Sequence, residues 1–253
     1  QYRDLDTFIH PDYKNRMDLK YVKRFSETKL SEEDVLKLKN EAQKLGFITI
    51  CTPFDEKSVE NIVKHGYDII KVASCSFTDW PLLEQIIQTD KPIVASIGGA
   101  KIEDIDKVVS FFQHRNKKFA IMHCVGQYPT PADQLQLNQI SLLKKRYPEV
   151  VIGFSTHESP DNFEAVKLAV AKRAGFFEKH VAIKSEKYPI NAYSATPEQI
   201  RKWLEAAREA YIYCGVAGQR HEFAQQELAD IRQFQRGVFA VSDIKAGERV
   251  EVK

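Results

Sequence analysis

Short apolar segments alternate with amphipathic segments along most of this 253-residue chain. The apolar segments are continuous, which is typical of parallel strands that are covered on both faces. We expect six such strands, at residues 47–53, 68–74, 92–97, 119–124, 150–156 and 174–181. They recur about every 25 to 30 residues, a spacing that fits successive strand–helix units. The alternation therefore predicts an α/β fold with a parallel sheet.

Helices are predicted between the strands. The first has Ser31 as its N-cap, carries acidic residues in its first turn and ends at Gly46. The last begins at Thr196-Pro197, where a capping residue precedes a proline at the first helical position. The complete set after the first helix is 57–64, 80–89, 102–114, 137–146, 161–173 and 197–214. No low-complexity linker interrupts this series.

Two architectures fit the series of strands. A TIM (β/α)8-type barrel has eight strands, of which about six are visible here. The chain starts with Gln1 and not with methionine, and residues 7–29 are polar, so we expect it to begin inside a longer barrel. The alternative is an open doubly wound sheet of six strands, which requires no missing residues. We predict the barrel.

Composition argues against several classes of function. The net charge is +2 with both signs interleaved, so no basic field for nucleic acid is present. No apolar run approaches the ~20 residues that span a bilayer, and no signal peptide is visible. The cysteines lack metal-type spacing, which indicates reduced thiols; they are Cys51, Cys75, Cys124 and Cys214. We expect a cytoplasmic protein that binds neither nucleic acid nor a membrane.

Two histidines stand at the ends of neighbouring predicted strands. His157 follows the strand at 150–156, and His180 lies near the end of the strand at 174–181. The carboxyl ends of strands carry the chemistry of parallel barrels, and two imidazoles there can bind one divalent metal. A single histidine is more often a packed or surface residue. Core packing does not require two at equivalent strand ends, so the pair predicts a metal site.

Polar residues also follow the other predicted strands. Hydroxyls, glycine amides and a lysine at one rim suit a phosphate or a carboxylate. Lys71 lies in an otherwise apolar strand, which favours a functional interior, although a salt bridge explains it equally well. The turn Ser96-Ile97-Gly98-Gly99 precedes a helix and offers backbone N–H groups to an anion, although many such turns contain glycine.

Several ordered motifs resemble those of the sialic acid synthase family. They are Thr52-Pro53-Phe54-Asp55, Ile70-Lys71-Val72-Ala73-Ser74, Ser96-Ile97-Gly98-Gly99-Ala100 with Glu103, Tyr128-Pro129-Thr130-Pro131, Ser155-Thr156-His157 and Phe177-Glu178-Lys179-His180. The resemblance covers nearly the whole chain. It implies that residues 1–240 form a barrel domain without its first strand–helix unit, with Gln1 in the second strand. It also implies that residues 241–253 begin a linker to an antifreeze-like (SAF) domain.

The resemblance implies a reaction. Phosphoenolpyruvate condenses with the aldehyde of an N-acyl hexosamine such as N-acetylmannosamine, giving a nine-carbon 2-keto sugar acid and phosphate. His157 and His180 would hold Mn²⁺ or Mg²⁺, which polarises the aldehyde oxygen. The other implied residues are Lys71, Glu103 and Tyr128 for catalysis and Ser74, Ser96, Gln127, Ser155 and Asn191 for substrate binding. Helix capping is the alternative role for Glu103. A homodimer is implied by resemblance only.

The chain departs from the family pattern at both histidines. The family has Ser-Asp-His-Thr where this chain has Ser155-Thr156-His157-Glu158, and Gly-Pro-Asp-His where it has a stretch containing Ile190 and Asn191. A lost carboxylate at a sugar hydroxyl changes which sugar is accepted. We expect the phosphoenolpyruvate and metal parts to be kept and the sugar part to be altered. The alternatives are a synthase for a phosphorylated aldose, for which no second cationic cluster is visible, and a non-catalytic relative that binds a sugar or a protein.

Overall fold

The computed structural model describes residues 12, 18 and 27–250. It divides into two compact units, Gln1–Tyr213 and Cys214–Lys253. The described residues of the second unit contain the helix α10 (Gln225–Phe234) and no strand. The prediction that Gln1 lies in a strand falls outside the described residues, as do most of the polar residues 7–29. The predicted domain bounds, 1–240 and 241–253, stay predictions.

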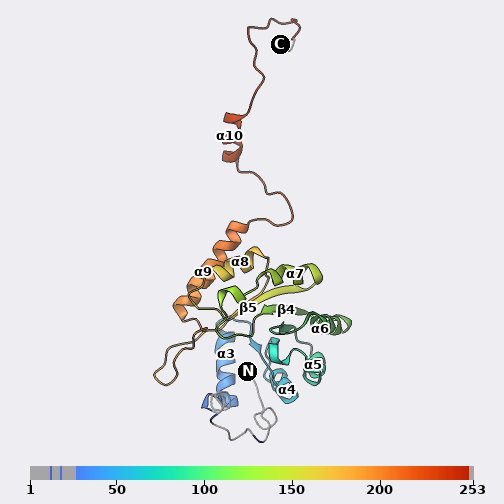
Figure 1. The fold of residues 1–253 in the computed structure, drawn as a ribbon, viewed down its shortest axis with the longest axis vertical. Coiled ribbons are helices and arrows are strands. Elements are labelled where there is room, and N and C mark those ends of the chain that lie inside the picture. Colours follow the sequence, from blue (N-terminus) through green and yellow to red (C-terminus); the bar gives the residue numbers. More distant parts are fainter. Residues whose placement is uncertain (1–11, 13–17, 19–26, 251–253) are drawn as a thin grey trace. The chain divides into compact units, whose positions relative to one another are not determined.

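Strands and helices alternate through the first unit (Figure 1). The strands are β1 (Ile50–Cys51), β2 (Ile69–Val72), β3 (Ile93–Ser96), β4 (Phe119–Cys124), β5 (Val151–Thr156) and β6 (Phe177–Lys179). The α-helices are α3 (Glu32–Lys44), α4 (Glu56–Lys64), α5 (Trp80–Ile87), α6 (Ile102–His114), α7 (Asn138–Arg146), α8 (Glu164–Ala171) and α9 (Pro197–Cys214). Every predicted strand and helix is confirmed with shifts at its ends, and α10 was not predicted.

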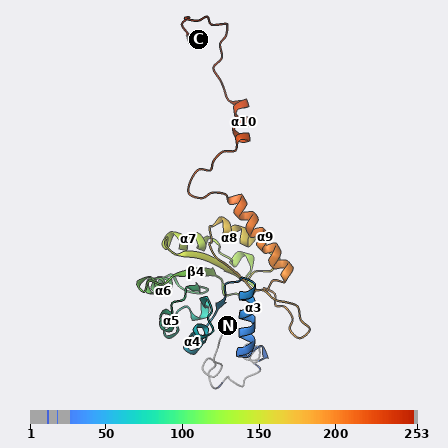
Figure 2. The same cartoon turned by 180° about the vertical axis from the view of Figure 1, so that it is seen from behind.

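The strands form one parallel sheet in the order β1-β2-β3-β4-β5-β6. Strands that are neighbours in the chain are therefore neighbours in the sheet, as they are in a barrel. A doubly wound sheet instead reverses its strand order at a switch point. Helices α4 to α8 lie in chain order around the outer face of the curled sheet (Figures 1 and 2). The described residues thus form part of a TIM-type barrel, and the doubly wound alternative is excluded.

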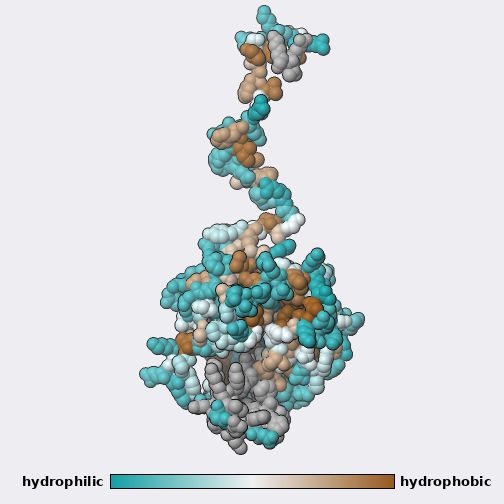
Figure 3. All heavy atoms as spheres, in the orientation of Figure 1, coloured by the Kyte–Doolittle hydropathy of each residue, from teal (hydrophilic) through white to brown (hydrophobic). Residues whose placement is uncertain are grey.

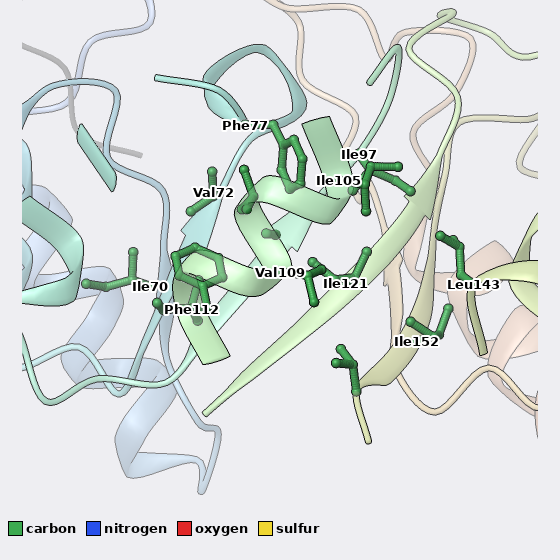
Figure 4. Packing of buried hydrophobic residues seen from close by; sticks show 14 of the residues in the cluster. Ile70, Val72, Phe77, Ile97, Ile105, Val109, Phe112, Ile121, Leu143 and Ile152 are labelled. Atoms are coloured by element: carbon green, nitrogen blue, oxygen red, sulfur yellow. The ribbon is translucent and has the colours of Figure 1, made fainter. Parts of the chain in front are cut away.

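The main hydrophobic core lies between the sheet and these helices. Successive residues of a strand point to opposite faces, so alternate residues of each strand face outward. Figure 4 shows Ile70, Ile121 and Ile152 of the strands in one cluster with Val109 and Phe112 of α6. Burying a side chain of this size stabilises the fold by about 1.5–3 kcal/mol. This packing holds each strand, and therefore each strand end, in a fixed position.

The inner face of the sheet changes from apolar to polar along the strands. Val94, Ala120 and Met122 form a small buried cluster, with Ile69 and Phe176 packed against it. Gly153 belongs to this face, because a Cβ atom there would lie 2.4 Å from the Met122 sulfur. The next inward residues toward the carboxyl ends of the strands are Lys71, Ser96, Cys124, Ser155 and Glu178. The pleat of the sheet therefore gathers reactive side chains at one end.

The surface of the first unit is mostly hydrophilic on the face seen in Figure 3, with hydrophobic side chains in separate patches. Among the described residues, no helix combines the length and the apolar character that crossing a membrane requires.

Candidate active site

A cavity of about 800 Å³ opens at the carboxyl ends of the strands. Most of the residues predicted for the site line it. They are Lys71, Ser74, Ser96, Tyr128, Ser155, His157, His180 and Asn191. The structure thus brings together residues from five strand ends and from the loop after β6.

Two predicted residues do not line this cavity. Glu103 is exposed in the first turn of α6, where a carboxylate interacts favourably with the helix dipole. Gln127 is also exposed, and its carbonyl oxygen accepts a hydrogen bond of 2.7 Å from the Thr130 hydroxyl. The geometry therefore gives no support to a direct role for either side chain, and for Glu103 it fits the alternative that the sequence left open.

Lys71 is the central cation of the cavity. It is 7% exposed, and its Nζ donates a hydrogen bond of 2.7 Å to Ser96 Oγ. The same Nζ lies 3.5 Å from Glu178 Oε2, while Ser155 donates a hydrogen bond of 2.8 Å to Glu178 Oε1. Both interpretations of Lys71 therefore hold, because it faces the cavity and also forms an ion pair. Glu178 was not predicted, although its position two residues before His180 places both side chains on the inner face.

One amide of the glycine turn after β3 is already hydrogen-bonded within the protein. The Gly98 N–H donates a hydrogen bond of 3.0 Å to Ser74 Oγ. A Cβ atom at Gly98 would come within 2.9 Å of that oxygen, so the close approach requires glycine. The Gly98 amide thus holds Ser74 at the cavity wall, and anion binding by the rest of the turn stays a prediction.

The two histidine rings lie 5.2 Å apart, centre to centre. His157 is 3% exposed, and its Nδ1 lies 3.0 Å from the Val125 carbonyl oxygen. A proton on Nδ1 satisfies that carbonyl and leaves the Nε2 lone pair for a metal. Burial lowers the pKa of His157 to about 4, so the ring is neutral at pH 7.

This arrangement fits an open metal site. Metal–nitrogen bonds of about 2.1 Å allow two rings at this separation to share one ion. No group of three or more His, Cys, Asp or Glu side chains suited to a metal occurs within the described part of the chain. An ion held by two imidazoles would complete its coordination with water and substrate, as ions in catalytic sites do.

Two tyrosines enclose the histidine pair. The Tyr128 ring lies 4.1 Å from that of His157, and the Tyr193 ring lies 5.2 Å from those of Tyr128 and His180. Burial raises the pKa of Tyr128 to about 12, so its hydroxyl stays protonated and can donate a hydrogen bond. Asn191 Oδ1 accepts from the Tyr193 N–H at 3.1 Å, which fixes the turn that carries this ring. Tyr193 was missed because its position depends on that turn.

The metal-free protein is expected to lose stability in acid through His157. Its folded pKa of about 4 lies below the ~6.5 of an unfolded histidine, so the unfolded state binds the proton first. The contribution is complete above about pH 6.5 and falls with pH, by about 2 kcal/mol at pH 5. Urea unfolding from pH 7.5 to 5 should show this slope, and it should be shallower in His157→Gln. Parallel pH profiles for the two proteins would contradict the assignment.

Comparisons with known proteins find relatives over nearly the whole chain. A model of the NeuB family matches residues 3–219. The uncharacterized protein MJ1065 of Methanocaldococcus jannaschii is 31% identical over 92% of this chain and 68% of its own length. A crystal structure from Chromobacterium violaceum, of a protein named after spore coat polysaccharide biosynthesis protein E, is 56% identical with a TM-score of 0.93. That match covers 98% of this chain and 74% of the other.

A third similar protein carries a more specific name. The N-acetylneuraminic acid synthetase of Leptospira borgpetersenii, whose crystal structure contains citrate, is 27% identical with a TM-score of 0.77. The match covers 87% of this chain and 77% of that one. The chain spans 58% and 46% of the lengths of two further curated relatives that it matches.

Proposed function

Because this chain belongs to the NeuB family, we propose that its cavity condenses phosphoenolpyruvate with the open-chain aldehyde of an N-acyl hexosamine. The enol carbon C3 forms a bond to the aldehyde carbon, water adds at C2, and the bond from C2 to the phosphate oxygen breaks. The products are a nine-carbon 2-keto sugar acid and phosphate. The observation that carries the proposal is the placement of Lys71 with its serines and of the His157–His180 pair in one cavity.

Lys71 and its neighbours would bind the anionic groups of phosphoenolpyruvate. A buried ammonium attracts an anion strongly because water screens it little. The hydroxyls of Ser74, Ser96 and Ser155 line the same cavity and supply further donors. Glu178 accepts from Ser155 and faces Lys71, so both side chains are already oriented without substrate.

The histidine pair would act on the second substrate. A divalent ion such as Mn²⁺ or Mg²⁺, bound by His157 and His180, would polarise the aldehyde oxygen as a Lewis acid. Tyr128 and Tyr193 border this part of the cavity and offer ring faces to the C–H groups of a sugar and hydroxyls to its oxygens. Asn191 adds a polar group on the same side. These residues would hold the sugar beside the anion site.

The charges of the cavity favour an unphosphorylated sugar. Among the described lining residues, the lysines are Lys71 and Lys179, and arginine is absent. Lys179 is already paired with Glu158 at 3.0 Å. Lys71 also has a carboxylate nearby, with Glu178 Oε2 at 3.5 Å, so the described lining has no second cationic cluster for a second phosphorylated substrate.

The test is phosphate release by the full-length protein from phosphoenolpyruvate, with Mn²⁺ and a panel of N-acyl hexosamines and their 6-phosphates. We expect release only when both the metal and an aldose are present, and faster release with the unphosphorylated sugars. A chelator should stop the reaction, and added Mn²⁺ should restore it. The absence of release with every aldose, together with no bound metal, would overturn the proposal.

A further inference from the structure

A buried ion pair connects the two strand ends that carry the histidines. Lys179 Nζ lies 3.0 Å from Glu158 Oε1, and their side chains are 1% and 2% exposed. The same ammonium donates a hydrogen bond of 3.1 Å to the Glu158 carbonyl oxygen. Lys179 therefore holds both the side chain and the backbone of Glu158.

The pair is adjacent to both histidines in the chain. Glu158 directly follows His157, just beyond β5, and Lys179 is the last residue of β6 and directly precedes His180. The strands are in register at this height, with Thr156 opposite Lys179. Because neighbouring strand residues point to opposite faces, Lys179 is directed away from the face that Glu178 and His180 share. The ion pair thus lies behind the histidines and links their backbones.

The energetics of the pair favour a role in geometry over one in stability. Removing two charges from water costs several kcal/mol per ion, and packed apolar residues of similar volume are often at least as stabilising. Here Glu158 Oε2 has no hydrogen-bond partner among the described residues, so the desolvation is incompletely compensated. The family pattern that this chain resembles has threonine at this position. Because the Glu158 carboxylate adds little stability but links two strand ends, we expect its main effect to be on the positions of His157 and His180.

We propose that the Glu158–Lys179 ion pair is a positioning element that sets the separation of the His157 and His180 rings. It would thereby set the affinity of the site for a divalent metal. This inference rests on the metal site of the proposed function. It assigns neither residue to catalysis or to metal binding, because each side chain is directed to the other. Groups that orient metal-binding histidines typically change metal affinity by about 10–100-fold when they are removed.

The experiment separates the effect of the ion pair on the histidine positions from its effects on net charge and on protein stability. Glu158→Leu with Lys179→Met removes the pair while keeping the net charge and much of the volume. The matched control is Glu198→Gln with Lys202→Met, which removes an exposed pair of 2.9 Å on α9. Mn²⁺ binding by each full-length protein is measured without substrates, from the electron paramagnetic resonance signal of the free ion. Urea unfolding of the metal-free proteins reports their stability.

We expect the buried double variant to stay folded, with its urea midpoint lowered because the Glu158 carbonyl loses its donor, and to bind Mn²⁺ at least about tenfold more weakly. The control should match the wild type in both measurements. Wild-type affinity in the folded double variant would overturn the inference. If that variant does not fold, Lys179→Arg keeps both charges and changes the length of the bridge, and unchanged affinity there overturns the inference equally.

Failure of the proposed function gives a different result. If the wild type binds Mn²⁺ and the buried double variant binds it more weakly, the positioning role stands even when no sugar supports phosphate release. If the wild type binds no Mn²⁺, both the metal site and this inference are wrong.

Discussion

His180→Ala is expected to reduce metal-dependent phosphate release by about 10³-fold or more and to leave the fold intact. The substitution removes one of two protein ligands from the proposed ion. Lewis-acid polarisation of a carbonyl lowers the reaction barrier by several kcal/mol. About 4 kcal/mol corresponds to a factor of 10³ in rate. The His180 side chain is exposed at the cavity, so no buried packing is lost. The measurement is phosphate release against Mn²⁺ concentration, with thermal unfolding of the metal-free protein as the test of folding.

A matched control is available on the same unit. His114 is an exposed histidine at the end of α6, where it contacts Ser110. His114→Ala removes the same group from a position that does not line the cavity, so the Mn²⁺ response should not change. Full metal-dependent activity in His180→Ala would show that the histidine pair does not hold the catalytic ion.

The order and type of the elements could be predicted because strands that are buried on both faces are continuous apolar runs in the sequence. Continuous apolar runs identified every strand of the described sheet, but they overestimated β1, predicted at 47–53. Only Ile50–Cys51 pairs with β2, while Phe47 and Ile48 are 64% and 72% exposed. Hydrophobicity shows that a segment is apolar, whereas a strand ends where its hydrogen bonds end. Helix α10 was missed because its start carries no capping signal: Ala224 stands at the N-cap without a side-chain hydrogen bond, whereas Ser31 caps α3.

The site could be predicted as a set of residues but not as a set of contacts. Strand ends meet at one edge of a parallel sheet, which is why Lys71, His157 and His180 were expected together. The contact of Ser155 with Glu178 depends on the register of β5 against β6, which places these two residues opposite one another. Register is set by packing across the whole sheet and is not readable from one strand. The contact of Tyr193 depends on a loop turn, which hydrophobic periodicity does not report.

Lys71→Met should lower kcat/KM for phosphoenolpyruvate by about 10³-fold, mainly by raising KM. Truncating one partner of a buried charge pair at a binding surface costs about 2–5 kcal/mol of binding, and the remaining Glu178 carboxylate would then repel the anionic substrate. Steady-state kinetics at varied phosphoenolpyruvate concentration measure the effect. Lys118→Met is the control, because Lys118 is exposed just before β4, at the opposite end of the sheet.

The partner carboxylate provides a second test of the same residue. Lys71→Met combined with Glu178→Gln removes both charges, so the repulsion of phosphoenolpyruvate by an unpaired carboxylate disappears. If Lys71 binds substrate and Glu178 only orients it, the double variant should bind phosphoenolpyruvate about tenfold more tightly than Lys71→Met, but still more weakly than the wild type. If Lys71 only neutralises Glu178, the double variant should regain the wild-type KM, because no buried charge is left unpaired. An unchanged KM in Lys71→Met itself would remove Lys71 from the anion site altogether.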